Sequence, residues 1–101
     1  MDNKKTIILD LNGCKYLGEI HQRIKESFGF PDFYGQNWSA FWDLLWSNCD
    51  ANKVVVRGLA SLSDDLITAK QKIPEILERL KEFRKDFNES EEMSFEFEIE
   101  D

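Results

Sequence analysis

Strand-like and helical segments alternate along the chain, and this order constrains the fold more than any other feature of the sequence. Residues 6–9 and 53–57 contain short apolar runs, whereas residues 93–99 alternate apolar and polar side chains. These are the patterns of buried and half-buried strands. Strands separated by helices favour parallel pairing through right-handed crossovers. The sequence therefore predicts a single α/β domain over residues 1–101, with a parallel sheet and the order β-α-α-β-α-α-β.

Apolar residues spaced three and four apart mark the helices. Leu17, Ile20, Ile24 and Phe28 follow this spacing and predict the first helix, with Gly18 as a candidate N-cap and Gly29 at the C-terminal end. A loop follows, and its last residue, Asn37, is a good N-cap for the helix expected over residues 38–47.

Two further helices are expected between the second and third strands. Residues 61–72 predict a short one. Pro74 suits the first turn of a longer one, because a backbone N–H in that turn has no partner within the helix. The apolar stripe expected to bury the longer helix consists of Ile73, Ile76, Leu77, Leu80, Phe83 and Phe87.

The balance of charge argues against two kinds of partner. The chain carries 20 acidic and 13 basic side chains, a net charge of −7, whereas nucleic-acid binding depends on Lys and Arg. The sequence contains no run of about 18 apolar residues, the length that a membrane-spanning helix needs. Residues 1–5 also lack the apolar stretch of a signal peptide. We therefore expect a cytoplasmic protein that binds neither nucleic acid nor a membrane.

The acidic surplus is unevenly distributed. Residues 1–87 hold 13 acidic and 13 basic side chains, so the whole excess lies in residues 88–101. Residues 27–52 contain no Lys or Arg, which makes this mostly apolar stretch locally negative. One face of the last strand carries Glu96, Glu98 and Glu100. These glutamates either protect a sheet edge from pairing, which we favour, or form an acidic contact surface.

Residues that usually carry catalysis are scarce. The single histidine, His21, falls at the edge of the apolar stripe of the first helix, where a structural or surface role is expected. Cys14 and Cys49 lack metal-binding spacing, so we expect free thiols and no metal site. Glycine-rich phosphate-binding motifs and the G-x-S-x-G motif do not occur. We expect neither an enzyme nor a cofactor.

Residues 28–46 are unusually aromatic, with eight of the 13 aromatic side chains and all three tryptophans. One arc of the expected helix carries Trp38, Phe41, Trp42 and Leu45. Ser39 and Asp43 fall on the neighbouring arc, and Trp46 lies between the two sets. Aromatic side chains beside a carboxylate are typical of protein interfaces, but a small domain also needs aromatic residues in its core. Composition alone leaves both interpretations open.

Residues 30–45, FPDFYGQNWSAFWDLL, resemble the signature loop and second helix of the barstar family. Members of this family are small cytoplasmic inhibitors of barnase-type ribonucleases. Asn12-Gly13 and His21 agree with the same family, and the resemblance is strong over residues 5–57 and looser beyond them. It implies a small three-stranded parallel sheet with packed helices.

The resemblance also implies a mechanism. Family members cover the basic active-site cleft of the nuclease with this loop and helix, and an aspartate takes the place of a substrate phosphate. Asp43 matches that aspartate. The other partner-binding residues proposed from the resemblance and the aromatic pattern are Phe33, Tyr34, Gly35, Asn37, Trp38, Ser39, Trp42, Trp46 and Glu82. We expect a monomeric antitoxin or immunity protein whose partner is a basic ribonuclease toxin.

The sequence departs from the family pattern within this segment. Ser39 stands where the best-known member has a second acid, one turn before Asp43. Phe33 replaces a tyrosine, and Trp38 replaces a smaller aliphatic residue. We therefore do not expect tight binding to barnase itself.

Two alternatives to a ribonuclease inhibitor remain open. One is a barstar-like interaction domain with a non-nuclease partner, which a pull-down would distinguish. The other is an enzyme, which a bound cofactor would favour.

Overall fold

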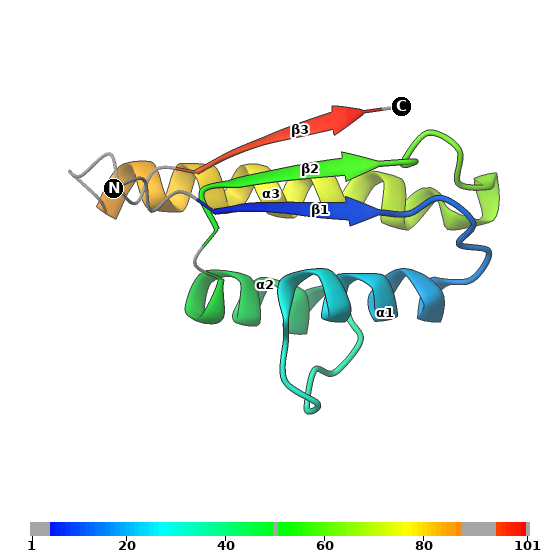
Figure 1. The fold of residues 1–101 in the computed structure, drawn as a ribbon, viewed down its shortest axis with the longest axis horizontal. Helices are drawn as coiled ribbons and strands as arrows, with labels where there is room; N and C mark the ends of the chain where they lie inside the picture. Colours follow the sequence, from blue (N-terminus) through cyan, green and yellow to red (C-terminus); the bar gives the residue numbers. More distant parts are fainter. Residues whose placement is uncertain (1–4, 50, 88–94, 101) are drawn as a thin grey trace.

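The chain folds into a parallel sheet with helices packed against one of its faces. The computed structural model describes residues 5–49, 51–87 and 95–100. The elements in chain order are β1 (Thr6–Asp10), α1 (Leu17–Phe28), α2 (Trp38–Asn48), β2 (Lys53–Arg57), the 3-10 helix η1 (Asp64–Leu66), α3 (Ile67–Phe87) and β3 (Glu96–Glu100) (Figure 1). The strands pair in parallel in the order β1-β2-β3, so the predicted α/β class and parallel sheet are confirmed.

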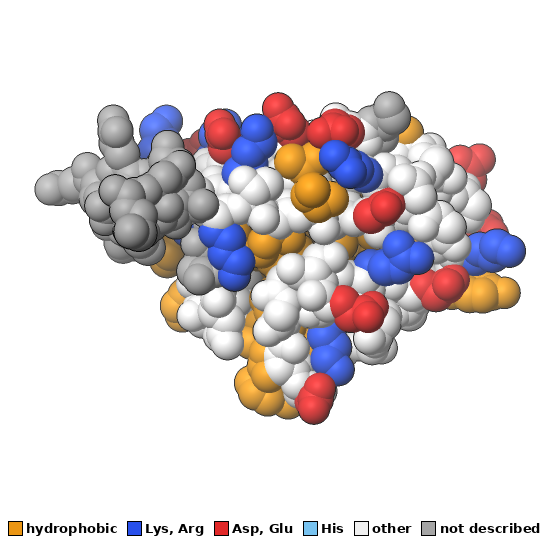
Figure 2. All heavy atoms as spheres, in the orientation of Figure 1, with side chains coloured by type: hydrophobic (Ala, Val, Ile, Leu, Met, Phe, Trp, Pro, Cys, Tyr) orange, Lys and Arg blue, Asp and Glu red, His pale blue; other side chains and the backbone are white. Residues whose placement is uncertain are grey.

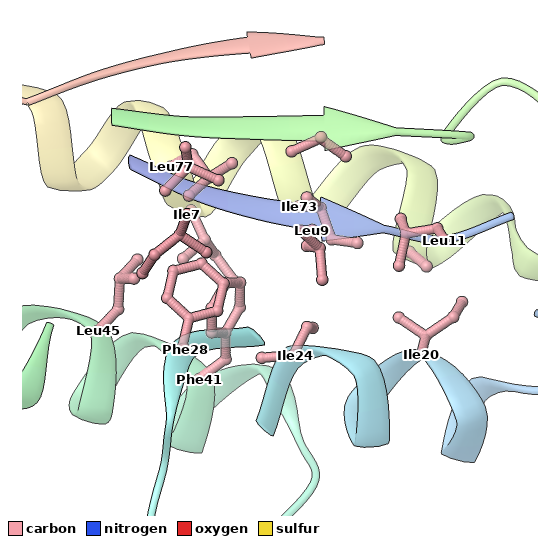
Figure 3. Close-up of a cluster of buried hydrophobic side chains, with 14 of the residues drawn as sticks. Ile7, Leu9, Leu11, Ile20, Ile24, Phe28, Phe41, Leu45, Ile73 and Leu77 are labelled. Carbon is pink, nitrogen blue, oxygen red and sulfur yellow. The ribbon is translucent and has the colours of Figure 1, made fainter. Parts of the chain in front are cut away.

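β1 buries one face and leaves the other open, whereas the central strand β2 also buries Val55 on the opposite face. Ile7 and Leu9 of β1 are in register with Val54 and Val56 of β2, and all four side chains are buried. Figure 3 shows Ile7 and Leu9 directed from β1 toward the helices. Ile8, which alternates with them, is 46% exposed on the opposite face. Because side chains alternate across a strand, this one-sided burial fixes which face the helices cover.

The helices complete one continuous core. α1 packs on β1, α3 packs on β3, and α2 packs against α3. The helical side chains labelled in the core of Figure 3 are Ile20, Ile24, Phe28, Phe41, Leu45, Ile73 and Leu77. Cys14 and Cys49 are both buried, and neither forms a disulfide in the described structure, as the sequence predicts. The predicted burial of Phe87 and Met93 and the acids in residues 88–94 lie outside the description, which at Phe87 gives the backbone alone.

The open face of the sheet carries charge rather than helices. Glu96, Glu98 and Glu100 are exposed, so the predicted polar face of β3 is confirmed. Two of them pair with basic side chains of the central strand: Lys53 Nζ lies 3.6 Å from Glu98 Oε1, and Arg57 Nε lies 3.4 Å from Glu100 Oε1. In Figure 2 basic and acidic side chains surround apolar ones over the strands. The glutamates thus also offset the charge of β2.

The start of α1 differs from the prediction, whereas its end agrees. The N-cap is Tyr16 and not Gly18. A carboxylate oxygen of Glu19 accepts hydrogen bonds from the backbone N–H groups of Lys15 (2.8 Å) and Tyr16 (3.2 Å), which stabilises an earlier first turn. At the other end, Gly29 has a φ of 69°, the left-handed conformation that glycine adopts without strain.

Two helical elements follow the second strand, as predicted, but the boundary between them differs from the expected one. Residues 61–72 contain only the short η1 and the beginning of α3, so Pro74 lies inside α3 instead of in its first turn. Pro74 has no N–H to donate to the carbonyl of Lys70. Ile73 and Leu77 are fully buried on either side of it, so tertiary packing continues the helix through the proline. No described helix, the 21-residue α3 included, is long and apolar enough to cross a membrane.

Replacing Pro74 with alanine should stabilise the protein, because alanine restores the N–H donor and removes the ring that crowds the preceding turn. An interior proline destabilises a helix by about 3 kcal/mol. Alanine also gives the unfolded chain more conformational freedom, which offsets up to about 1 kcal/mol of the gain in stability. We expect the free energy of unfolding in urea to rise by about 1–2 kcal/mol. Pro31→Ala in the loop is the control and should give no increase. Equal or lower stability of Pro74→Ala would contradict this interpretation.

Candidate functional site

The loop between α1 and α2, residues 29–37, projects from the helical layer (Figure 1). Phe30 and Tyr34 are buried and anchor this loop, whereas Phe33 between them is 77% exposed. Figure 2 shows apolar side chains at the lower end of the molecule, where the loop projects. The loop is therefore held from inside at two points and presents an aromatic ring to solvent.

A buried hydrogen bond fixes the loop to α1. His21 Nδ1 and the Tyr34 hydroxyl are 2.6 Å apart, and the imidazole centroid lies 4.6 Å from that of Trp38. Burial lowers the pKa of His21 and raises the pKa of Tyr34. The other ring nitrogen of His21, Nε2, is buried without a hydrogen-bond partner in the described part of the chain. The site therefore favours a neutral imidazole, and the role of His21 in this arrangement is structural.

Asn37 sets the start of α2, as predicted. Its Oδ1 accepts a hydrogen bond from the Ala40 N–H (2.8 Å), and its Nδ2 donates to the Gly35 carbonyl (3.2 Å). A Cβ atom on Gly35 would lie 3.3 Å from Asn37 Nδ2, so a larger residue would crowd this cap. Gln36, between them, has a φ of 51°. The loop and the first turn of α2 are thus tied into one local unit.

α2 has a buried inner face and an exposed outer face. The inner face consists of Phe41, Leu44 and Leu45. Ser39 and Asp43 are exposed, Trp46 is 48% exposed, and Trp38 and Trp42 are half-buried at the border. The Asp43 carboxylate has no hydrogen-bond or ion-pair partner among the described residues. Because α2 also contains no basic side chain, this negative charge is available to a partner.

α3 forms a second wall beside α2, and two hollows lie between the helices. One, of about 320 Å³, is lined by Trp38, Ser39, Trp42, Asp43, Lys72, Glu75, Ile76 and Arg79. The other, of about 500 Å³, is lined by Trp42, Trp46, Arg79, Glu82 and Phe83. Trp42 and Arg79 border both hollows, and the guanidinium carbon of Arg79 lies 4.1 Å from the Trp42 ring centroid. The stacked pair separates a polar hollow from an aromatic one.

The structure gathers most of the residues that the sequence proposed for partner binding. Those of α2 line the two hollows, and Glu82 of α3 joins them. Phe33, Gly35 and Asn37 are exposed on the adjoining loop. Tyr34 is placed differently: only 6% of it is exposed, because its ring fills the space between loop and core and its hydroxyl bonds to the imidazole. It supports the surface from within.

Three polar residues of these hollows were not foreseen from the sequence: Lys72, Glu75 and Arg79. Helical spacing gives one signal, because Arg79 lies three residues before Glu82 and three after Ile76. The sequence does not show that α3 packs beside α2. That packing brings Arg79 over Trp42, 37 positions earlier in the chain.

Two similarities to known proteins extend over most of the chain. Residues 4–100 match the family described as Barstar (barnase inhibitor). The chain is also 30% identical over 81 residues to a protein of Bacillus subtilis (strain 168) named "Putative ribonuclease inhibitor YrdF". That alignment covers 72% of this chain and 89% of the Bacillus protein. The family match includes every described residue, and so both helices that line the hollows.

Buried His21 should make the stability of the fold depend on pH just below neutrality. Burial lowers the pKa of the folded imidazole below its ordinary value of 6.5, so the unfolded chain binds this proton more readily than the folded chain. The resulting stability is complete above the unfolded pKa and is lost as the pH falls from about 6.5 through the folded pKa. The urea unfolding midpoint should therefore be steady from about pH 8 to 7 and fall below about pH 6.5.

The chain has only one histidine, so His21→Gln is a direct control. Its midpoint should change much less over the same pH interval, whatever its absolute stability. An NMR titration of the native imidazole should also give a pKa below 6.5. A native pKa at or above that value, or equal pH dependence of the two proteins, would contradict the neutral buried state.

Proposed function

The chain belongs to the family described as Barstar (barnase inhibitor), and we propose that it inhibits a ribonuclease by covering the active site with the α1–α2 loop and α2. Asp43 carries the proposal. Its carboxylate is exposed and without a partner in the described structure, at the position that resembles the phosphate-mimicking aspartate of the family. Arg, Lys and His groups that hold an RNA phosphate can form charge-assisted hydrogen bonds with a carboxylate instead.

The surroundings of Asp43 suit a tight protein contact. Phe33 is 77% exposed and Trp46 is 48% exposed, and both are large apolar groups whose burial against a partner would release water. The hydrogen bonds of Asn37 and the buried anchors of the loop fix the backbone that carries Phe33, and Trp46 packs against Phe83 of α3 with ring centroids 6.0 Å apart. An ordered surface loses less entropy on association than a mobile one. Inhibition then needs no reaction, only exclusion of RNA from the cleft.

Charge also supports a basic partner. The net charge of the chain is −7, and residues 27–52 contain no Lys or Arg. A negative protein and a positive cleft attract each other over a Debye length, which speeds encounter, an effect for which barstar and barnase are themselves a standard example. We propose that the chain acts as a monomer in the cytoplasm, as an antitoxin or immunity protein that protects RNA.

The direct test is to immobilise the purified chain, recover what it retains from a lysate of its source, and assay the bound fraction for RNA cleavage. We propose that a basic ribonuclease is retained and that added chain abolishes its activity at about one-to-one stoichiometry. Retention of a protein without ribonuclease activity would instead support a barstar-like interaction domain with another partner. If no ribonuclease is retained or inhibited, the proposed function is wrong.

Removing the charge of Asp43 without changing its shape should weaken inhibition strongly. Asp43→Asn keeps the size of the side chain but leaves the basic groups of the cleft without their counter-charge. A hydrogen bond to a charged group contributes about 1.5–3 kcal/mol, so we expect the dissociation constant to rise by about ten- to a hundredfold. Glu96→Gln makes the same charge change on the open face of the sheet and should have little effect. Equal effects of the two variants on inhibition would indicate that β3, and not α2, forms the binding surface.

A further inference from the structure

A basic side chain lies within the surface that is proposed to bind a basic protein. Arg79 is exposed and lines the same 320 Å³ hollow as Asp43. Lys72, in the same hollow, has its Nζ 3.9 Å from the carboxylate of Glu75. No carboxylate of the described residues lies within ion-pair distance of the Arg79 guanidinium, which stacks on the Trp42 ring. Lys72 therefore has an ion-pair partner within the hollow, whereas Arg79 has none among the described residues.

The contact with Trp42 prepares Arg79 for a further interaction. The aromatic ring takes one face of the planar guanidinium, and the N–H groups at its edges are still available as donors. Stacking also restricts a long side chain before binding, which lowers the entropy lost when a partner fixes it. Guanidinium donors match a carboxylate in bidentate geometry better than any other common protein acceptor.

We propose that Arg79 is a specificity-determining residue that binds a carboxylate of the ribonuclease, next to the basic groups that bind Asp43. This inference rests on the proposed function and specifies its partner. The ribonuclease that fits this surface has a rim of mixed charge, with a basic group facing the polar hollow and an Asp or Glu facing the Trp42–Arg79 pair. A nuclease whose rim is basic throughout is disfavoured, because Arg79 repels it.

Two variants separate this local role from an effect of total charge. Arg79→Gln removes the unpaired charge beside Asp43. Lys81→Gln removes one positive charge from an exposed position of the same helix that lines neither hollow. Both proteins are titrated against the ribonuclease that the unmodified chain retains, and against barnase as a probe with a basic cleft. Circular dichroism and urea unfolding show that each variant is folded.

Arg79→Gln should weaken binding of the retained ribonuclease by about tenfold or more, because a charge-assisted hydrogen bond is lost. The same variant should inhibit barnase at a concentration about threefold lower than the unmodified chain does, since a repulsive charge has been removed. Lys81→Gln should change both the affinity for the retained ribonuclease and the concentration that inhibits barnase by less than Arg79→Gln does. Arg79→Glu should lose binding to the ribonuclease, and a ribonuclease with arginine in place of the facing carboxylate should bind this variant again. The same ribonuclease variant should not bind Lys81→Glu.

Equal binding of Arg79→Gln and the unmodified chain to the retained ribonuclease would overturn the role of Arg79 while leaving the proposed function intact. An unchanged barnase titration, including no inhibition by either protein, would overturn the repulsive part of the inference. If the unmodified chain retains no ribonuclease at all, the proposed function fails, and this inference fails with it.

Discussion

Burial of the inner face of α2 fixes the rotation of this helix about its axis, and the candidate site depends on that rotation. Phe41 and Leu45 are fully buried in the core. Asp43 lies two residues from each, about 200° around the helix from both, so it faces solvent. The same packing that stabilises the domain therefore presents the carboxylate. A substitution that rotated α2 would disturb the core and the exposed surface together.

The loop before α2 is positioned by a separate but adjoining set of contacts. The hydrogen bond between His21 and Tyr34 joins it to α1, and Asn37 joins it to the first turn of α2. Buried side chains thus support an exposed surface that includes the ring of Phe33. A protein that acts by occupying a cleft benefits from this arrangement, because its contact groups are ordered before the partner arrives.

Local patterns predicted the α/β class, the strands and the cap at Asn37, because periodicity and capping depend on neighbouring residues. The interior position of Pro74 was missed because burial of α3 on both sides of the proline outweighs its local preference. The burial of Tyr34 and the contact of Arg79 with Trp42 were also missed. Each joins elements that are distant in sequence. The importance of Asp43 came from a family resemblance, and its lack of a described partner came from the structure.

The central claim is that the projecting loop and α2 form the surface that meets a ribonuclease. Hydroxyl-radical footprinting of the free chain and of its complex measures this directly, because exposed aromatic side chains are oxidised. Phe33 and Trp46 should become protected in the complex, whereas Tyr16, which is 71% exposed at the start of α1, should be oxidised equally in both. Unchanged oxidation of Phe33 and Trp46 in a saturated complex would contradict the account.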